Sequence, residues 1–87
     1  MATVKLLDFW APWCGPCKVM NPIIEELEKE LGDKVPVEKI NVDENQEMAS
    51  KYGVMSIPTY IVLKDDKEIG RKIGVTGKQD LLKLLQS

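Results

Sequence analysis

Residues 4–18 read VKLLDFWAPWCGPCK and contain the first predicted strand together with both cysteines of the chain. Apolar side chains occupy both alternating faces as far as Trp10, which predicts a central strand covered on both sides. A helix is predicted to begin at Cys14, because apolar residues then recur at helical spacing as far as Leu31. Gly32 is a residue type that commonly follows a helix, so the helix is predicted to end there.

The middle of the chain predicts a second strand and a short helix. The strand covers residues 35–42 and contains Pro36, which cannot donate a hydrogen bond to a sheet, so we expect this strand at an edge. Residues 45–52 are predicted to form the short helix, with Asp43 or Asn45 as its cap.

The last third of the chain predicts a β-hairpin followed by a helix. Two β-rich runs, residues 59–63 and 68–73, flank the turn-forming residues 65–66. Thr76 and Gln79 match the spacing of a capping box, which predicts a closing helix after them. The resulting order, β-α-β-α-β-β-α, indicates an α/β chain with a four-stranded mixed sheet flanked by three helices.

Length and composition narrow the possible functions. Residues 1–87 are expected to form a single domain, because little chain is left for a second one. The net charge is −2 and no Lys/Arg cluster stands out, so neither nucleic acid nor a membrane surface is expected as a partner. The absence of histidine excludes Cys-His and Ser-His catalysis, and two cysteines are too few for a structural zinc site, so no metal is expected. The sequence lacks a membrane-spanning apolar run and a signal-peptide pattern, so we expect a cytoplasmic protein.

Cys14 and Cys17 stand three positions apart at the predicted start of a helix, so their sulfurs can meet. Free N–H groups and the helix dipole stabilise a thiolate at Cys14, and Lys18 adds a positive charge nearby. Cys17 lies deeper in the turn and is expected to be more buried and less reactive. An attacking thiolate with a close second thiol is what thiol–disulfide exchange requires, and Pro16 keeps the turn between them stiff.

Two other roles of the cysteine pair stay open at this point. A structural disulfide is one, although closing so short a loop stabilises a fold by only about 2 kcal/mol in the chain-entropy model. A metal site shared between two copies is the other, and it requires the motifs of both copies to face each other. We favour redox chemistry, because the motif lies between a strand and a helix.

Residues 8–18 resemble the active-site signature of the thioredoxin family. Further matching segments follow in the same order: Pro22, residues 39–43, 52–54 and 57–59, and Gly74. The resemblance covers nearly the whole chain and implies a minimal thioredoxin fold. Family members ordinarily have an additional strand and helix before the strand at residues 4–10. Without them, the strand at residues 35–42 is expected to be an exposed sheet edge.

The resemblance also implies roles for residues around the cysteines. Cys14 matches the family's nucleophile and Cys17 its resolving thiol, with Pro16 between them. Asp8 matches the residue that accepts or relays the proton of Cys17, and Lys39 matches the lysine near that carboxylate. The apolar neighbours of Asp8 indicate burial, which raises the pKa of a carboxyl group.

A second group of residues is expected to contact the substrate. Pro58 matches a proline whose preceding peptide bond is cis in the family, and the backbone before it pairs with an extended substrate. Trp13 is expected on the surface, where it would form an apolar docking rim with Ile57 and Gly74. Met55 is interpreted as a packing residue without special chemistry.

The resemblance implies a dithiol–disulfide oxidoreductase that reduces protein disulfides through a mixed disulfide at Cys14. The expected partners are disulfide-containing proteins and a thioredoxin-reductase-like electron donor, which would recycle the Cys14–Cys17 disulfide without a bound cofactor. We expect a monomer. Glutaredoxin-like chemistry is one alternative. The other is a binding module, in which the surface of Trp13, Ile57 and Gly74 holds a partner and the cysteines are incidental.

Overall fold

The computed structural model describes residues 3–86, and its helices and strands follow the predicted order. The elements are β1 (Val4–Trp10), α1 (Gly15–Leu31), β2 (Val37–Asn41), α2 (Gln46–Lys51), β3 (Thr59–Lys64), β4 (Lys67–Ile73) and α3 (Lys78–Leu85). Among these helices, none combines the length and the apolar composition needed to cross a membrane within residues 3–86.

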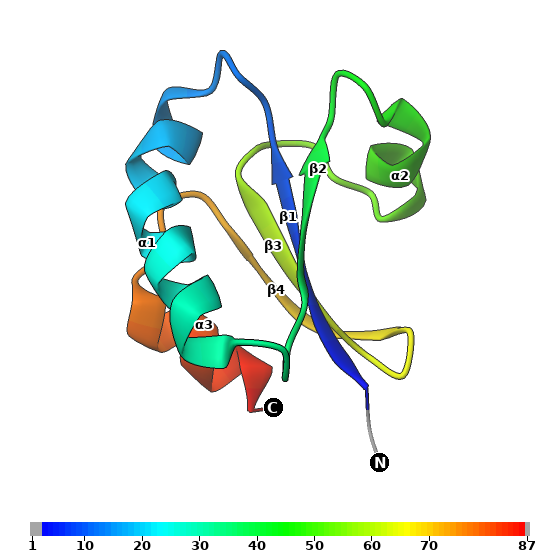
Figure 1. Ribbon diagram of the computed structural model, residues 1–87. Coiled ribbons are helices and arrows are strands. Elements are labelled where there is room, and N and C mark those ends of the chain that lie inside the picture. Colours follow the sequence, from blue (N-terminus) through cyan, green and yellow to red (C-terminus); the bar gives the residue numbers. More distant parts are fainter. Residues whose placement is uncertain (1–2, 87) are drawn as a thin grey trace.

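The strands form one mixed sheet in the order β2-β1-β3-β4 (Figure 1). β1 runs parallel to β2 and antiparallel to β3, so the strand predicted to be central is central. β2 lies at an edge, as predicted, but it is shorter than residues 35–42. Pro36 precedes the strand and contributes only its carbonyl oxygen, which accepts a hydrogen bond from the Leu6 N–H at 3.0 Å.

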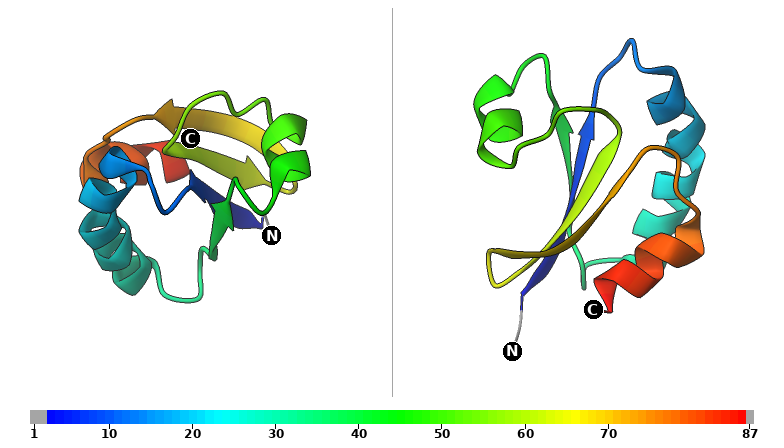
Figure 2. Two further views of the ribbon diagram at one scale, coloured as in Figure 1. Left: turned by 90° about the horizontal axis from the view of Figure 1, so that it is seen from above. Right: turned by 180° about the vertical axis from the view of Figure 1, so that it is seen from behind.

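The helices cover both faces of the sheet, with α1 and α3 on one face and α2 on the other (Figure 1, Figure 2). The buried cluster under α1 and α3 contains Leu6, Met20, Ile24, Leu27, Tyr60, Val62 and Leu81. The cluster on the α2 face contains Leu7, Phe9, Ile40, Ile61 and Leu63. Successive β1 residues alternate between these clusters, so Asp8 faces α1, as Leu6 does.

The predicted capping box at Thr76 and Gln79 is wrong. Gly77 is the N-cap of α3, and no side-chain hydrogen bond caps this helix. The Thr76 hydroxyl instead donates to the Gly74 carbonyl oxygen at 3.1 Å, and the Thr76 N–H donates to Met20 Sδ at 3.3 Å. Both groups of Thr76 therefore stabilise the turn before α3, and its hydroxyl does not reach the helix.

The expected side-chain cap of α2 is also absent in the structure. Asn45 occupies the N-cap position, but its side-chain amide donates to the Asn41 carbonyl oxygen at 3.1 Å. The Asp43 carboxylate accepts a hydrogen bond from Trp13 Nε1. Both candidate caps thus bond outside the helix.

Asp65 and Asp66 form the two-residue turn between β3 and β4, and their φ angles are 52° and 68°. A two-residue hairpin loop with both φ angles positive is a type I′ turn, which favours glycine at its second position. Asp65 has an additional role, because its Oδ1 accepts a hydrogen bond from the Thr3 N–H at 2.8 Å.

Replacing Asp66 with glycine is expected to stabilise the protein by up to about 1 kcal/mol, because glycine adopts a positive φ without steric cost. For a chain of this size, 1 kcal/mol corresponds to roughly 4–8 °C in melting temperature, which thermal unfolding followed by circular dichroism measures. Asp65→Gly is the matched control and should gain less, since it also removes the acceptor for Thr3. A lower melting temperature for Asp66→Gly would contradict this prediction.

Candidate active site

Cys14 and Cys17 form a disulfide at the N-terminus of α1, with their Cα atoms 5.2 Å apart. Cys14 is the N-cap residue, and its Sγ accepts a hydrogen bond from the Cys17 N–H at 3.1 Å. Pro16 lies in the first turn, where its missing N–H costs no helical hydrogen bond. The helix end thus directs an N–H at the Cys14 sulfur, an arrangement that stabilises negative charge there.

Both cysteines are buried, with 3% of each residue exposed. The expectation that Cys17 is the more buried of the two is therefore wrong for the disulfide form. The residues packed with the two cysteines are Trp10, Ala11, Val42 and Ile57. A molecule that reaches the Cys14 sulfur therefore comes close to the apolar side chains of this cluster.

Asp8 is a buried carboxyl group, with 4% of the residue exposed, on the β1 face that α1 covers. It lies in register with Lys39 of β2 and Tyr60 of β3. Burial raises the pKa of Asp8 to about 6, while the charge of Lys39 lowers it and the charge of Glu28 raises it further. Burial, and then the charge of Asp8, also raises the pKa of Tyr60. Asp8 therefore changes protonation near pH 6, closer to neutral pH than an ordinary carboxyl group, which suits a group that exchanges protons with a thiol.

Lys39 lies opposite Asp8 in the sheet and forms an ion pair with a residue of α1. The pairing of β1 with β2 holds Lys39 opposite Asp8, and its Nζ lies 3.8 Å from Glu28 Oε1. Lys39 and Glu28 are both partly exposed, so their ion pair adds little to the free energy of unfolding. The main effect of this pair is to fix where the lysine charge lies relative to Asp8.

Trp13 lies on the surface beside the disulfide, with 68% of the residue exposed. Its Nε1 donates a hydrogen bond to Asp43 Oδ2 at 2.8 Å, which joins the cysteine motif to the connection between β2 and α2. The indole is thus held in one orientation although little protein covers it.

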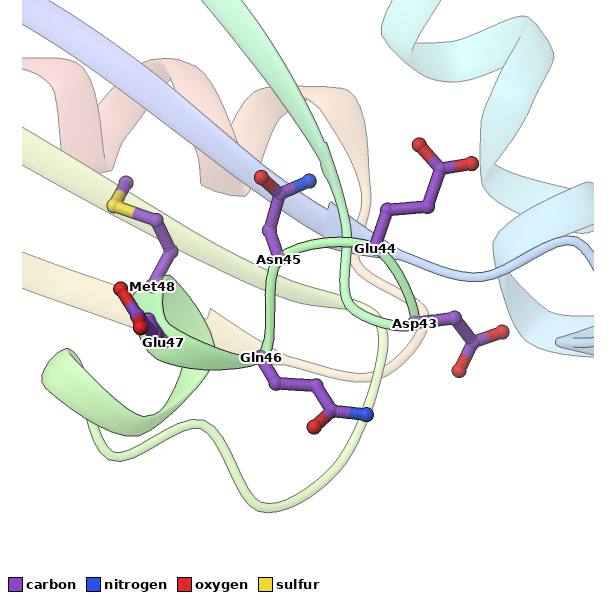
Figure 3. Close-up of a pocket in the computed structure, with 6 residues that line it drawn as sticks. All are labelled: Asp43, Glu44, Asn45, Gln46, Glu47 and Met48. Carbon is purple, nitrogen blue, oxygen red and sulfur yellow. The ribbon is translucent and has the colours of Figure 1, made fainter.

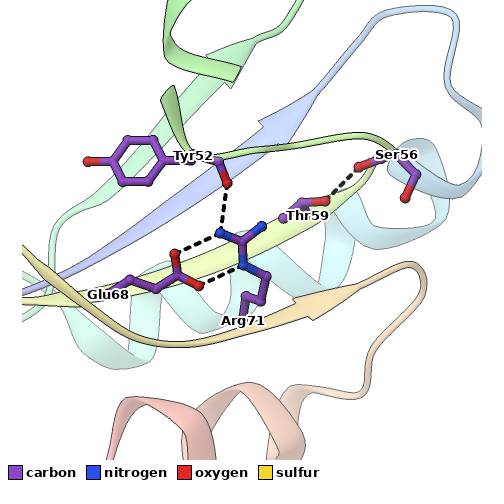
Figure 4. Close-up of polar contacts among 5 residues, drawn as sticks. All are labelled: Tyr52, Ser56, Thr59, Glu68 and Arg71. Carbon is purple, nitrogen blue, oxygen red and sulfur yellow. Dashed lines mark hydrogen bonds and ion pairs between the residues drawn. The ribbon is translucent and has the colours of Figure 1, made fainter. Parts of the chain in front are cut away.

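Residues 53–58 connect α2 to β3 and are called the anchored loop below. The Ile57–Pro58 peptide bond at its end is cis. The Gly74 N–H donates to the Pro58 carbonyl oxygen at 2.8 Å. Figure 4 shows the second bond, in which Thr59 Oγ1 donates to the Ser56 carbonyl oxygen at 2.6 Å. Two separate hydrogen bonds therefore fix the second half of the loop.

Arg71 of β4 holds the start of the anchored loop. Its Nη2 donates to the Tyr52 carbonyl oxygen at 2.7 Å (Figure 4). The guanidinium also contacts both carboxylate oxygens of Glu68, from Nε at 2.6 Å and from Nη2 at 2.7 Å, which fixes its orientation. No sequence pattern indicates this role of Arg71, because its partner at Tyr52 is a backbone atom far away in the sequence.

An apolar groove of about 350 Å³ lies beside the disulfide and is called the Trp13 groove. Its lining residues are Trp13, Val42, Ala49, Val54, Met55, Ser56 and Ile57. Gly74 does not line this groove, and its expected part in docking stays a prediction. Met55 is 97% exposed, so its interpretation as a packing residue is wrong. Its position in the middle of the anchored loop places it at the surface.

A second hollow, of about 530 Å³, lies where β2 leads into α2 (Figure 3). It is lined by Asp43, Glu44, Asn45, Gln46, Glu47 and Met48. In Figure 3 the three carboxylates point away from one another. In the part of the chain that the structure describes, no three Cys, Asp or Glu side chains are grouped so that they could hold a metal ion.

Comparison with known proteins assigns this arrangement to a family. The family model for thioredoxin matches residues 2–87. The chain belongs to the thioredoxin family. It is therefore a thioredoxin-type protein-disulfide oxidoreductase, and the Cys14–Cys17 pair provides the redox-active disulfide of such a thioredoxin.

Individual thioredoxins agree with the chain in sequence and in fold. It is 57% identical to a thioredoxin of Bacillus subtilis over 82 residues, which cover 94% of this chain and 79% of the relative. A thioredoxin of Rickettsia typhi is 53% identical over 77 residues, covering 88% and 73% of the two chains. The solved structure of Fasciola hepatica thioredoxin superposes with a TM-score of 0.88 at 38% identity, over 97% of this chain and 79% of the other. The structure thus has the minimal thioredoxin fold that the sequence predicted.

Proposed function

We propose that this thioredoxin-family chain reduces disulfides in other proteins through a mixed disulfide at Cys14. The observation that supports this proposal most directly is the position of Cys14 at the N-cap of α1, where its sulfur accepts the Cys17 N–H at 3.1 Å. A sulfur that accepts a hydrogen bond at a helix N-terminus is stabilised as a thiolate, and the thiolate is the nucleophile in disulfide exchange.

The exchange takes place in two steps that move two electrons to the substrate. In the first step the Cys14 thiolate attacks one substrate sulfur. The substrate disulfide breaks, a Cys14–substrate disulfide forms, and the other substrate sulfur leaves as a thiolate. In the second step Cys17 loses its proton and attacks the Cys14 sulfur, which forms the Cys14–Cys17 disulfide and releases the second substrate thiolate.

Asp8 is proposed to accept the proton that Cys17 loses. It faces α1 from β1, and the first turns of α1 carry Cys17. A carboxyl group with a pKa of about 6 is mostly ionised at neutral pH and can still be protonated by a nearby thiol. Lys39 holds a positive charge beside this carboxylate, and Pro16 keeps the turn that carries both cysteines stiff.

The substrate polypeptide is proposed to lie beside the disulfide, along the Trp13 groove and the end of the anchored loop. Trp13 and Ile57 provide apolar contact area in the groove. The backbone before Pro58 is proposed to pair with an extended substrate segment, as added strands do, and Gly74 holds the Pro58 carbonyl in place.

The electrons are proposed to come from a thioredoxin-reductase-like donor, which reduces the Cys14–Cys17 disulfide after each turnover. The chain needs no bound cofactor, since the two thiols hold both electrons. We propose that it acts as a monomer in the cytoplasm, on disulfide-containing proteins rather than on nucleic acid or a membrane.

Single-turnover reduction of insulin tests this proposal. The chain is first reduced, freed of reductant and mixed with insulin. We expect one insulin disulfide to be lost for each Cys14–Cys17 disulfide formed, counted by thiol labelling and mass spectrometry. A chain that stays in the dithiol form while insulin stays oxidised would overturn the proposal.

The same preparation distinguishes the two alternatives. Recycling of the oxidised chain by glutathione alone would favour glutaredoxin-like chemistry. A chain with both cysteines replaced by serine that still binds its protein partners with full affinity would favour a binding module.

A further inference from the structure

Met55 is a large apolar side chain that is almost fully exposed. The anchored loop around it is fixed on both sides, by Arg71 at the Tyr52 carbonyl and by Thr59 at the Ser56 carbonyl. The Met55 side chain is therefore exposed in a loop whose conformation is fixed by these hydrogen bonds. Apolar residues that gather in an exposed patch mark contact surfaces, whereas single ones do not, and the exposed Trp13 lines the same groove as Met55.

The other described methionines are in different surroundings. Met20 is 1% exposed, and its sulfur accepts the Thr76 N–H at 3.3 Å. Met48 is partly buried and packs against the cluster on the α2 face. Met1 lies outside the described residues. Among residues 3–86, Met55 is thus the methionine whose sulfur is most accessible to solutes.

Met55 also belongs to the surface that a substrate must contact. It lines the Trp13 groove together with Val42 and Ile57, and these two residues also pack against the buried cluster that contains Cys14 and Cys17. A polypeptide whose disulfide reaches the buried Cys14 therefore lies next to this groove. A flexible, polarisable thioether is well suited to contact apolar side chains of differing shape.

We propose that Met55 is a peroxide-sensitive modification site: hydroperoxides oxidise its thioether to the sulfoxide, and the sulfoxide weakens docking of disulfide-containing polypeptides on the Trp13 groove. This inference rests on the proposed function and adds a means of regulating it. The physical cause is the change from an apolar thioether to a polar sulfoxide, which disfavours burial against apolar side chains.

The reaction needs only the protein and a hydroperoxide. The Met55 sulfur donates an electron pair to one peroxide oxygen, and a sulfur–oxygen bond forms as the oxygen–oxygen bond breaks. The proton on the transferred oxygen moves to the other oxygen, which leaves as water, or as an alcohol when an organic hydroperoxide reacts. Sulfur is oxidised by two electrons and the peroxide is reduced by two, so the reaction balances. Methionine sulfoxide reductases reverse the modification.

Hydrogen peroxide treatment of the disulfide form tests the proposal, because a disulfide protects both cysteines. After removal of the peroxide, mass spectrometry locates the added oxygen, and KM and kcat for insulin reduction driven by dithiothreitol are compared with those of the same untreated sample. We expect one oxygen on Met55 before Met20 or Met48 is modified. We also expect KM to rise about fivefold or more while kcat changes little.

Two variants serve as matched controls, each compared with its own untreated sample. Met55→Leu removes the thioether but keeps an apolar side chain of similar size, so its KM should be unchanged by peroxide. Met48→Leu keeps Met55 and should show the same rise in KM as the original chain. Treatment with methionine sulfoxide reductase should restore the original KM.

The remaining outcomes contradict either the inference about Met55 or the proposed function, and the experiment distinguishes the two. Oxidation of Met55 without a change in KM, or an equal rise in KM for Met55→Leu, would overturn the inference and leave the proposed function intact. Oxidation of Met20 or Met48 before Met55 would also overturn it. Failure of the untreated chain to reduce insulin would overturn the proposed function itself, and this outcome is visible before peroxide is added.

Discussion

Replacing Cys17 with serine is expected to stop turnover and to leave the substrate covalently joined to Cys14. The chain has two cysteines, so the variant keeps the attacking thiolate at the N-cap of α1 and loses the thiol that would release the substrate. With insulin as substrate, the rate should fall to that of dithiothreitol alone. Without dithiothreitol, a mixed disulfide should accumulate, which non-reducing electrophoresis and mass spectrometry detect.

Cys14→Ser is the matched control for this trapping experiment. It keeps Cys17, which lies inside α1 and not at the N-cap, and whose own N–H points at position 14. We expect this control to form little adduct. Equal amounts of adduct from the two variants would show that the chemistry does not distinguish the cysteines, which contradicts the assigned roles.

Replacing Asp8 with asparagine is expected to stabilise the protein by about 3 kcal/mol at pH 7. A pKa raised from 3.8 to about 6 means that the ionised carboxylate is disfavoured in the folded state, and the difference corresponds to about 3 kcal/mol at 1.36 kcal/mol for each pKa unit. Asparagine has a similar shape and no charge. Chemical unfolding at several pH values measures the effect.

The stabilisation by Asp8→Asn is expected to depend on pH. The folded state binds the Asp8 proton more tightly than the unfolded state, so the contribution of Asp8 to the stability of the original chain falls as the pH rises from about 4 to about 6. The difference between Asp8→Asn and the original chain should be small below pH 4, grow through this window and stay constant above it. Asp33→Asn changes an exposed carboxylate and should alter stability by less than about 0.5 kcal/mol.

The same substitution should slow disulfide exchange by about tenfold at neutral pH, because asparagine cannot accept the proton of Cys17. A variant that is more stable and slower fits a buried proton acceptor. An unchanged exchange rate would contradict the proton-transfer role of Asp8, and a loss of stability at pH 7 would contradict the cost of its burial.

Much of the fold was predictable from local sequence patterns. Apolar residues on both faces of residues 4–10 indicated a central strand, because both faces must then be covered. Pro36 indicated an edge strand, because proline has no N–H group to donate to a neighbouring strand. The hairpin followed from the turn residues Asp65 and Asp66. Each of these features is determined by residues that are close together in the sequence, so it can be recognised from the local pattern.

The remaining features depend on contacts between distant segments. Thr76 matched a capping box, but its polar groups bond to Gly74 and Met20 instead. Arg71 reaches the Tyr52 carbonyl, a backbone acceptor that no side-chain pattern indicates. Met55 is a large apolar residue of the kind usually found in a core, and only the path of the anchored loop places it on the surface.

Dithiothreitol-driven reduction of insulin by the original chain and by Cys14→Ser is the decisive test of disulfide exchange through Cys14. We predict that the original chain accelerates reduction well above dithiothreitol alone and that Cys14→Ser gives no acceleration. Equal acceleration by the two proteins would contradict exchange through Cys14.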